Sequence, residues 1–309
     1  MKTFSRLALL LLLLPTASAF AAPPATPAAT AATPATSAPA AAPAATPTPA
    51  TPAVHDPNLP PTEATAKSQL DTSPRHGEYV DIALPGGGKL NAWVVYPEKK
   101  GKAGVVILIH EIYGLSDWFR GVADQLAKEG FIAIAPDLIS GIGPNGGGTA
   151  SAASRDDVVA LVRGLTPEVT TARLNAVRDF AKKIPAANGK IAAIGFCWGG
   201  GQSFAYAASE PTLDGAVVYY GVTPESADLA KIKAPVLGLY GGDDARISST
   251  ITATQAEMKK LGKAYEPHVF PGAGHGFLRA QDDRDGANLK AAKTAWPRTL
   301  EFLRDRLGK

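Results

Sequence analysis

Short, unbroken apolar runs alternate with helical patterns through the C-terminal part of this sequence, and no other feature constrains the fold as strongly. The runs are GVVILIH, FIAIAPD, KIAAIGF, GAVVYYG and PVLGLYG, which begin at residues 104, 131, 190, 215 and 235. Runs of this length are typical of strands buried on both faces of a parallel sheet. Helical patterns at 117–130, 167–183 and 248–262 have the length of crossover connections. The sequence therefore predicts a mostly parallel, doubly wound α/β sheet with helices on both faces.

Two further segments, EYVDIAL at 78–84 and LNAWVVYP at 90–97, alternate between apolar and polar residues as half-buried strands do. The sequence PGGGK lies between them. Its glycines suit the positive backbone angles of a tight turn, and we interpret it as a hairpin turn instead of a phosphate-binding loop. The domain is therefore expected to begin with an antiparallel hairpin.

The first residues, MKTFSRLALLLLLLPTASAF, have the layout of a secretory signal peptide. Lys2 and Arg6 precede a leucine run that is followed by small residues, so cleavage is expected after Ala19 or Ala21. The apolar run is too short to span a bilayer comfortably, and no cysteine follows it to carry a lipid anchor. We expect residues 1–21 to be removed and the mature protein to be periplasmic or secreted, without stable membrane insertion.

Residues 22–67 consist almost entirely of alanine, proline and threonine. This composition offers too little large apolar surface to offset the entropy lost on ordering, so we predict a disordered linker. Residues 68–309 have the length of one α/β domain. The net charge of +3 is small, and basic residues are dispersed among acidic ones, which argues against nucleic acid as a partner. We expect the protein to be a monomer.

The only cysteine of the chain, Cys197, lies in the sequence IGFCWGGG directly after an apolar run, and a single cysteine excludes an internal disulfide. A strand, a Gly-x-Cys-x-Gly turn and a helix of small residues form the pattern of a nucleophile elbow with cysteine in place of serine. The helix directs its N-terminus at the sulfur, which predicts a thiol pKa below the free value of about 8.5. The alternative is a buried structural cysteine in a glycine-rich turn.

An elbow nucleophile is expected to be followed along the chain by an acid and then by a histidine. The sequence GGDDARIS follows the apolar run at 235–241 and offers Asp243 and Asp244. His275 follows the strand-like EPHVF, in the glycine-rich loop PGAGHGF. This order predicts a triad of Cys197, one of the two aspartates and His275. An aspartate that only caps the next helix, and a histidine that only belongs to a loop, are the alternatives.

The sequence HEIYG at 110–114 follows another apolar run. Gly114 stands where a zinc-binding HExxH motif needs its second histidine, and the segment ends a strand, so we reject a metal site. A loop at this position supplies one N–H of the oxyanion hole in elbow hydrolases, which makes the amides of Ile112 and Trp198 the candidate oxyanion donors. Glu111 is placed to approach the sulfur, and an ion pair with a surface base is the alternative.

Four ordered stretches together resemble the dienelactone hydrolase family of the α/β-hydrolase superfamily: HEIYGLSDWFRGVADQLAKEGFIAIAPDL, IGFCWGGG, YGGDDARI and GAGHGF. The resemblance covers residues 78–309 and implies the α/β-hydrolase fold. It also implies a triad of Cys197, Asp244 and His275. Asp244 is favoured because it occupies the Gly-Gly-x-Asp position of the family pattern.

The resemblance further implies roles for two charged residues. Glu111 matches the family glutamate that contacts the thiol and helps to deprotonate it. Arg279 matches the arginine that binds the substrate carboxylate in members that cleave dienelactone, with a surface arginine as the alternative. Residues 139–165 depart from the compact segment of small cytosolic members, and we expect this stretch to shape the pocket rim. This departure and the predicted export argue against dienelactone itself as the substrate.

These observations predict an exported hydrolase that cleaves a small ester or lactone through a cysteine nucleophile and a thioester acyl-enzyme. His275 would act as the general base, and no metal or organic cofactor is required. Two alternatives remain. One is a thiol redox protein, although the chain has no second cysteine to resolve an oxidised thiol. The other is a catalytically weak binding module of the cell envelope.

Overall fold

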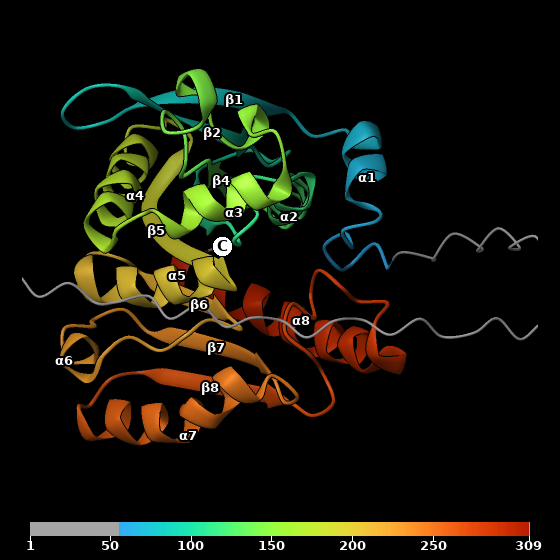
Figure 1. The fold of residues 1–309 in the computed structure, drawn as a ribbon, viewed down its shortest axis with the longest axis vertical. Helices are drawn as coiled ribbons and strands as arrows, with labels where there is room; N and C mark the ends of the chain where they lie inside the picture. Colours follow the sequence, from blue (N-terminus) through green and yellow to red (C-terminus); the bar gives the residue numbers. More distant parts are fainter. Residues whose placement is uncertain (1–55, 309) are drawn as a thin grey trace, which may run out of the picture. The chain divides into compact units, whose positions relative to one another are not determined.

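A single eight-stranded sheet organises residues 56–308, which the computed structural model describes (Figure 1). The strand order is β1-β2-β4-β3-β5-β6-β7-β8, with β2 antiparallel to both of its neighbours and every other neighbouring pair parallel. The strands are β1 (Gly77–Ala83), β2 (Lys89–Val95), β3 (Ala103–Ile109), β4 (Ile132–Pro136), β5 (Ala187–Phe196), β6 (Gly215–Tyr219), β7 (Val236–Gly241) and β8 (Tyr265–Phe270). The predicted α/β-hydrolase sheet is confirmed.

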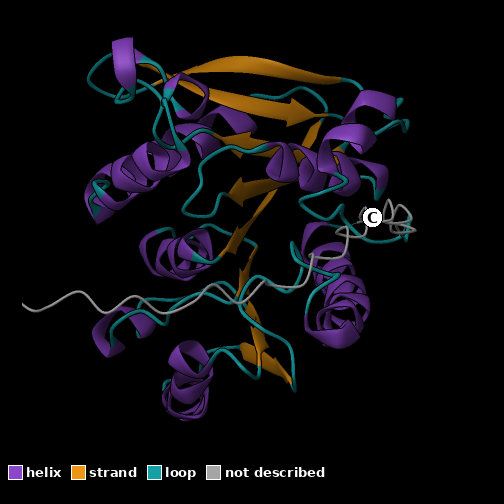
Figure 2. Ribbon diagram, turned by 45° about the vertical axis from the view of Figure 1, so that its right-hand side comes forward, coloured by secondary structure: helices purple, strands orange, loops and turns teal. Residues whose placement is uncertain are grey.

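Helices cover both faces of this sheet (Figure 2). The α-helices of the described part are α1 (Ala66–Thr72), α2 (Asp117–Lys128), α3 (Arg155–Arg163), α4 (Pro167–Ala181), α5 (Trp198–Ser209), α6 (Ser226–Leu229), α7 (Ala245–Lys260) and α8 (Ala287–Leu307). Successive side chains of β3 face opposite layers. Val106 and Leu108 pack with residues of α2 and α8, whereas Val105, Ile107 and Ile109 pack with residues of α4 and α5. Burial on both faces explains why every residue of β3 is apolar.

The predicted hairpin turn joins β1 and β2. Gly86, Gly87 and Gly88 all have positive φ angles, between 82° and 105°. The Leu84 amide donates a hydrogen bond to the Gly88 carbonyl oxygen at 3.1 Å and closes the turn. The interpretation as a hairpin turn is confirmed.

The folded domain begins earlier than the composition predicted. Residues 56–67 fall within the predicted linker, yet Leu59 is 2% exposed and Ala66 is fully buried. The buried indole of Trp118 on α2 donates a hydrogen bond to the Pro61 carbonyl oxygen at 2.8 Å. One leucine and a few prolines are enough to cover α2 here, and a count of large aliphatic residues does not reveal this.

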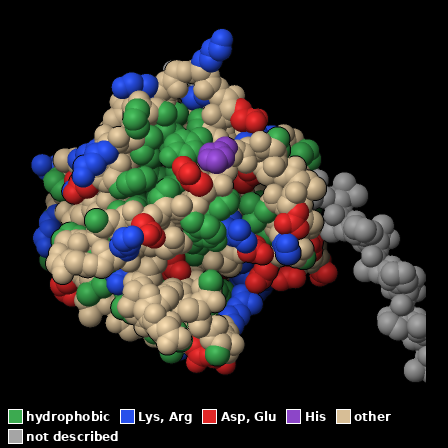
Figure 3. Space-filling model, turned by 90° about the horizontal axis from the view of Figure 1, so that it is seen from above, with side chains coloured by type: hydrophobic (Ala, Val, Ile, Leu, Met, Phe, Trp, Pro, Cys, Tyr) green, Lys and Arg blue, Asp and Glu red, His purple; other side chains and the backbone are tan. Residues whose placement is uncertain are grey.

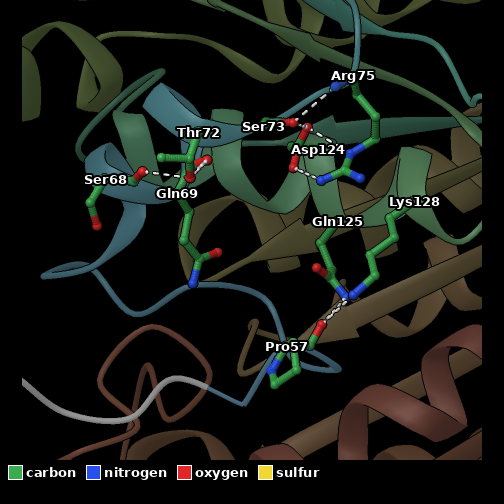
Figure 4. A network of polar contacts seen from close by, with 9 residues as sticks. All are labelled: Pro57, Ser68, Gln69, Thr72, Ser73, Arg75, Asp124, Gln125 and Lys128. Carbon is green, nitrogen blue, oxygen red and sulfur yellow. Dashed lines mark hydrogen bonds and ion pairs between the residues drawn. The ribbon is translucent and has the colours of Figure 1, made fainter.

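Further contacts fasten residues 56–65, called here the N-terminal segment, to α2. The carbonyl oxygen of Pro57 accepts hydrogen bonds from Lys128 at 2.6 Å and from Gln125 at 3.3 Å (Figure 4). The predicted domain boundary at Ser68 is therefore wrong, because the residues just before it are part of the domain. The predicted signal peptide and the rest of the predicted linker lie outside the described residues.

The stretch at 139–165 contains helix α3, which the sequence pattern did not predict because its apolar face is so short. Val158 and Val162 are its buried residues. They form a small cluster against which Ile112 and Trp198 pack. This stretch therefore borders the two candidate oxyanion residues, and its place at a pocket rim stays a prediction.

One face of the domain carries side chains of several kinds close together. Seen from above, hydrophobic side chains gather among acidic and basic ones over the end of the sheet where β1 lies (Figure 3). Tyr79 of β1 is 52% exposed.

None of the helices between residues 56 and 308 combines the length and the apolar character that a membrane span needs.

Candidate active site

Cys197 lies at the carboxyl end of β5, in the sharp turn that leads into α5. Its backbone φ is 56° and its ψ is −118°, a combination that residues other than glycine rarely adopt. Gly195 and Gly199 allow the turn, since a Cβ atom on Gly195 would lie 1.8 Å from the carbonyl oxygen of Gly199. The turn places the thiol at the N-terminus of α5. This is the strained strand-turn-helix geometry of a nucleophile elbow.

Asp244 and His275 pair at the same end of the sheet. Asp244 lies in the loop after β7 and directly precedes α7. His275 lies in the loop between β8 and α8. His275 Nδ1 and Asp244 Oδ2 are 2.5 Å apart. The carboxylate accepts this hydrogen bond, so Nδ1 carries the proton and Nε2 is the basic nitrogen. In this resting state, no hydrogen bond joins Cys197 Sγ to His275 within the described part of the chain.

The structure distinguishes the two neighbouring aspartates. Asp243 is half exposed and accepts a hydrogen bond from Arg284 Nη1 at 2.9 Å. Asp244 has a side chain that is only 9% exposed and faces His275. It makes no capping hydrogen bond to α7, which removes the alternative of a simple helix cap. The aspartate that the family pattern favours is the one that contacts the histidine.

Glu111 is the buried acid of this site, with a side chain that is 3% exposed. Its Oε2 accepts a hydrogen bond from Arg279 Nε at 2.9 Å. Its Oε1 is buried and has no hydrogen-bond partner among the residues described. Burial raises the pKa of this carboxyl, while the positive charge of Arg279 lowers it. Glu111 thus has the ion pair that we gave as its alternative, and it keeps one free oxygen.

The prediction of a lowered thiol pKa is wrong for the resting protein. Burial raises the pKa of Cys197 to about 11, and the negative charge of Glu111 acts in the same direction. The Trp198 amide at the start of α5 lowers the pKa, as do the charges of Arg246 and Arg279, but their effects are smaller. The thiol is therefore neutral at pH 7, and the thiolate forms only when its surroundings change so that the pKa of Cys197 falls.

Ile112 and Trp198 are available as oxyanion donors. Trp198 is the first residue of α5, so its amide has no partner within the helix. Ile112 follows β3, and its amide donates no backbone hydrogen bond in residues 56–308, while the Trp198 amide points at the sulfur of Cys197 and lowers its pKa. Gly199 lets α5 approach the end of β3, since a Cβ atom there would lie 2.2 Å from the carbonyl oxygen of Ile109. Trp198, at the start of α5, therefore lies near the end of β3, and Ile112 follows that end in the chain.

His110 supports the loop that carries Ile112, a role that the sequence did not reveal. Its ring is fully buried, with Nδ1 at 2.7 Å from the Glu111 carbonyl oxygen. Its Nε2 accepts a hydrogen bond from the Leu138 amide at 3.2 Å. A carbonyl only accepts, so Nδ1 carries the proton and the ring is neutral. Burial lowers the pKa of His110, which keeps it in this form.

Tyr220 is a second residue that the sequence analysis missed. It follows β6 with a φ of 39°, and its ring centre lies 5.1 Å from that of His275. Its hydroxyl is buried without a hydrogen-bond partner in the described chain. Burial and the negative charge of Glu111 hold its pKa well above the usual value. A buried donor without a partner beside these groups is suited to a substrate oxygen. Its place at the end of the apolar run that begins at residue 215, directly after β6, is the signal that could have revealed it.

These elements define the class of the protein. A strained nucleophile between β5 and α5, an acid after β7 and a histidine after β8 are the arrangement of an α/β-hydrolase. The part of the chain that the structure describes has no group of three or more His, Cys, Asp or Glu residues that could hold a metal ion.

Comparison with known sequences indicates one family. The profile of the Dienelactone hydrolase family matches residues 90–307. A Salmonella typhimurium protein, provisionally named a carboxymethylenebutenolidase, is 33% identical over 240 residues, which cover 72% of this chain and 85% of that one. The carboxymethylenebutenolidase of Pseudomonas putida is 30% identical over 232 residues, which cover 73% of this chain and 95% of that one.

A solved structure agrees. The crystal structure of a Klebsiella pneumoniae protein, provisionally named a dienelactone hydrolase, matches with a TM-score of 0.63 at 28% identity and covers 74% of this chain and 98% of that one. This chain belongs to the dienelactone hydrolase family. The resemblance stated from the sequence motifs is confirmed.

Iodoacetamide is expected to alkylate Cys197 slowly at neutral pH, with a rate that rises about tenfold per pH unit between pH 7 and 10. Only the thiolate reacts, and with a pKa of about 11 roughly one thiol in 10⁴ is ionised at pH 7. The measurement is the mass of the Cys197 peptide after timed labelling. Glu111→Gln is expected to shift the profile to lower pH, but burial should keep it above that of free cysteine. A wild-type midpoint below about 8.5 would contradict the account.

Proposed function

We propose that this protein is an exported, cysteine-dependent hydrolase that cleaves a small ester or lactone through Cys197, Asp244 and His275. The observation that carries the proposal is the strained turn at Cys197, on the sheet edge where Asp244 and His275 pair. The relatives and the family have names that refer to a dienelactone or a butenolide, which supports a lactone or ester bond as the one cleaved.

The first half-reaction transfers the acyl group to sulfur. The amides of Ile112 and Trp198 bind the substrate carbonyl oxygen, and Cys197 Sγ attacks the carbonyl carbon. The thiol proton moves to His275 Nε2, and Asp244 stabilises the imidazolium. The bond from carbon to the leaving oxygen then breaks, and that oxygen takes the proton from Nε2. The acyl group remains on Cys197 as a thioester.

The second half-reaction returns the enzyme to its resting state. His275 Nε2 accepts a proton from water while the water oxygen bonds to the thioester carbon. The same two amides stabilise the second tetrahedral oxyanion. The carbon–sulfur bond breaks, sulfur regains a proton from Nε2, and the carboxylic acid leaves.

Glu111 supports activation of the thiol from the other side. Its free Oε1 can hold the thiol proton before the proton reaches His275, and burial favours the protonated carboxyl. Protonation also removes the negative charge that raises the pKa of Cys197. Glu111 thus helps to keep the resting thiol neutral. Once Glu111 has accepted the proton, it would favour the thiolate.

The proposal includes the location and organisation of the chain. Residues 1–21 act as a signal peptide and residues 22–55 as a linker ahead of the folded domain. The domain acts on a small molecule as a monomer. N-terminal sequencing of the mature protein tests the export step, and a mature chain that still starts at Met1 would contradict it.

A panel of small esters and lactones, assayed with the wild-type protein and with Cys197→Ala, tests the proposed function. Turnover that the substitution abolishes supports the hydrolase. A thiol redox protein would instead consume peroxide in a Cys197-dependent way without hydrolysing any ester. A binding module would bind members of the panel with equal affinity in both proteins and turn none of them over.

A further inference from the structure

Arg279 is held between two carboxylates. On one side its Nε donates to Glu111, and on the other its Nη1 donates to Oε2 of Glu63. The backbone adds a link, because the Glu63 amide donates to the Arg279 carbonyl oxygen at 3.1 Å. The second oxygen of Glu63 accepts a hydrogen bond from Arg155 Nη2 at 3.1 Å. Arg155 in turn lies 3.6 Å above the ring centre of Tyr113. Both oxygens of Glu63 are therefore used within this cluster.

Glu63 reaches Arg279 because hydrogen bonds hold the residues of the N-terminal segment that come directly before Glu63. The buried amide of Gln281 donates to the Pro60 carbonyl oxygen at 2.9 Å. The indole of Trp118 donates to the Pro61 carbonyl oxygen at 2.8 Å. These donors come from α2 and from the loop that also carries Arg279, so they hold the segment against both. The position of Glu63 is thus set by its neighbours as well as by its own ion pairs.

The two carboxylates limit what else Arg279 can bind. A guanidinium presents two forks, Nε with Nη2 and Nη1 with Nη2, and either can hold a carboxylate with two hydrogen bonds. Glu111 occupies one donor of the first fork, and Glu63 occupies one donor of the second. The charges also balance, since Glu63 and Glu111 face Arg155 and Arg279. A substrate carboxylate would be a third anion with no complete fork to receive it.

We propose that Glu63 is an internal carboxylate that excludes acidic substrates, so that the site selects neutral esters or lactones. The inference rests on the proposed hydrolase function and adds the substrate class to it. It replaces the expectation, taken from the family resemblance, that Arg279 binds a substrate carboxylate. Glu63 lies outside residues 90–307, which the family profile matches, so the family pattern gives no information about it.

The test compares two esters of similar size and different charge, 4-nitrophenyl butyrate and mono-4-nitrophenyl succinate. The wild-type protein is expected to have the higher kcat/KM for the neutral butyrate. Glu63→Gln removes one of the two carboxylates that face Arg279 and leaves the cluster with one positive charge, and the neutral amide is a weaker partner that a substrate carboxylate can displace. It should raise kcat/KM for the succinate ester roughly 10-fold, mainly through a lower KM, and leave the butyrate within about 2-fold. Added salt should reduce the gain.

Glu78→Gln is the matched control. Glu78 on β1 has a side chain that is 46% exposed, against 48% for Glu63, and it faces His76 instead of Arg279. In Glu78→Gln, the ratio of kcat/KM for the succinate ester to kcat/KM for the butyrate ester should equal that of the wild type. A Glu63→Gln ratio within about 2-fold of the wild type, or an equal change for both esters, would overturn the proposal. Thermal unfolding of both variants shows whether they fold normally.

A binding measurement separates this inference from the proposed function. Calorimetric titration with succinate uses Cys197→Ala and its Glu63→Gln double variant, and it needs no turnover. The double variant should bind succinate roughly 10-fold more tightly. Tighter binding without any ester turnover by the wild type would contradict the proposed function and support the inference. Butyrate turnover with unchanged or undetectable succinate binding would support the function and overturn the inference.

Discussion

Cys197→Ala is expected to lower kcat for ester hydrolysis by about 10⁴-fold or more, the largest effect of any single substitution in this protein. The remaining rate would come only from substrate binding and the oxyanion donors, since no other thiol exists in the chain. The melting temperature should change little, because Cys197 is only partly buried and alanine meets the same backbone strain. The measurement is kcat with 4-nitrophenyl butyrate, together with thermal unfolding followed by circular dichroism.

Cys197→Ser is the matched control for this substitution. It retains a nucleophilic oxygen that His275 can deprotonate, so its kcat should lie between those of the wild type and the alanine variant. Loss of both activity and melting temperature in Cys197→Ala would indicate a structural cysteine. An alanine variant that keeps more than a tenth of the wild-type kcat would contradict a cysteine nucleophile.

Asp244→Asn is expected to lower kcat by roughly 10³- to 10⁴-fold, whereas Asp243→Asn should change it less than about 3-fold. The difference follows from their partners. Asp244 accepts a hydrogen bond from the protonated Nδ1 of His275, and an asparagine there allows the tautomer in which Nε2 can no longer accept a proton. Asp243 only pairs with Arg284 on the surface, and exposed pairs contribute little.

The two variants control for each other, since they make the same chemical change in adjacent residues. Steady-state kinetics with one neutral ester is enough to rank them. Equal losses would mean that the acid acts by general electrostatics instead of by fixing the histidine tautomer. The reverse ranking would mean that Asp243 replaces Asp244 beside His275 when substrate binds.

The sheet and the positions of the candidate triad residues could be predicted because each depends on local sequence. β3 and β7 are buried on both faces, so their residues are apolar without interruption. The turn at Cys197 needs glycine two residues before and two residues after it, and this spacing is visible in the sequence. Asp244 and His275 lie in the loops that follow β7 and β8, so a search just after the predicted strands was enough to find them.

The remaining features depend on contacts between distant parts of the chain. The pKa of Cys197 is set by burial and by Glu111, which a motif does not show. The pairing of Glu63 with Arg279 joins residues that are 216 positions apart. No periodicity or spacing encodes such a contact, and the prolines around Glu63 resemble those of the linker before it. The composition of residues 56–67 therefore resembles that of a disordered linker, and the boundary predicted from composition lies too late in the chain.

The central claim is that the acyl group passes through the sulfur of Cys197, and trapping that intermediate tests it most directly. The wild-type protein is mixed with 4-nitrophenyl butyrate, quenched in acid within the first turnovers, digested and analysed by mass spectrometry. The account predicts a butyryl group on the peptide that contains Cys197, labile to hydroxylamine as a thioester is, and absent from Cys197→Ala. A butyryl group on another residue, or turnover with a burst of nitrophenol and no acyl group on Cys197, would contradict it.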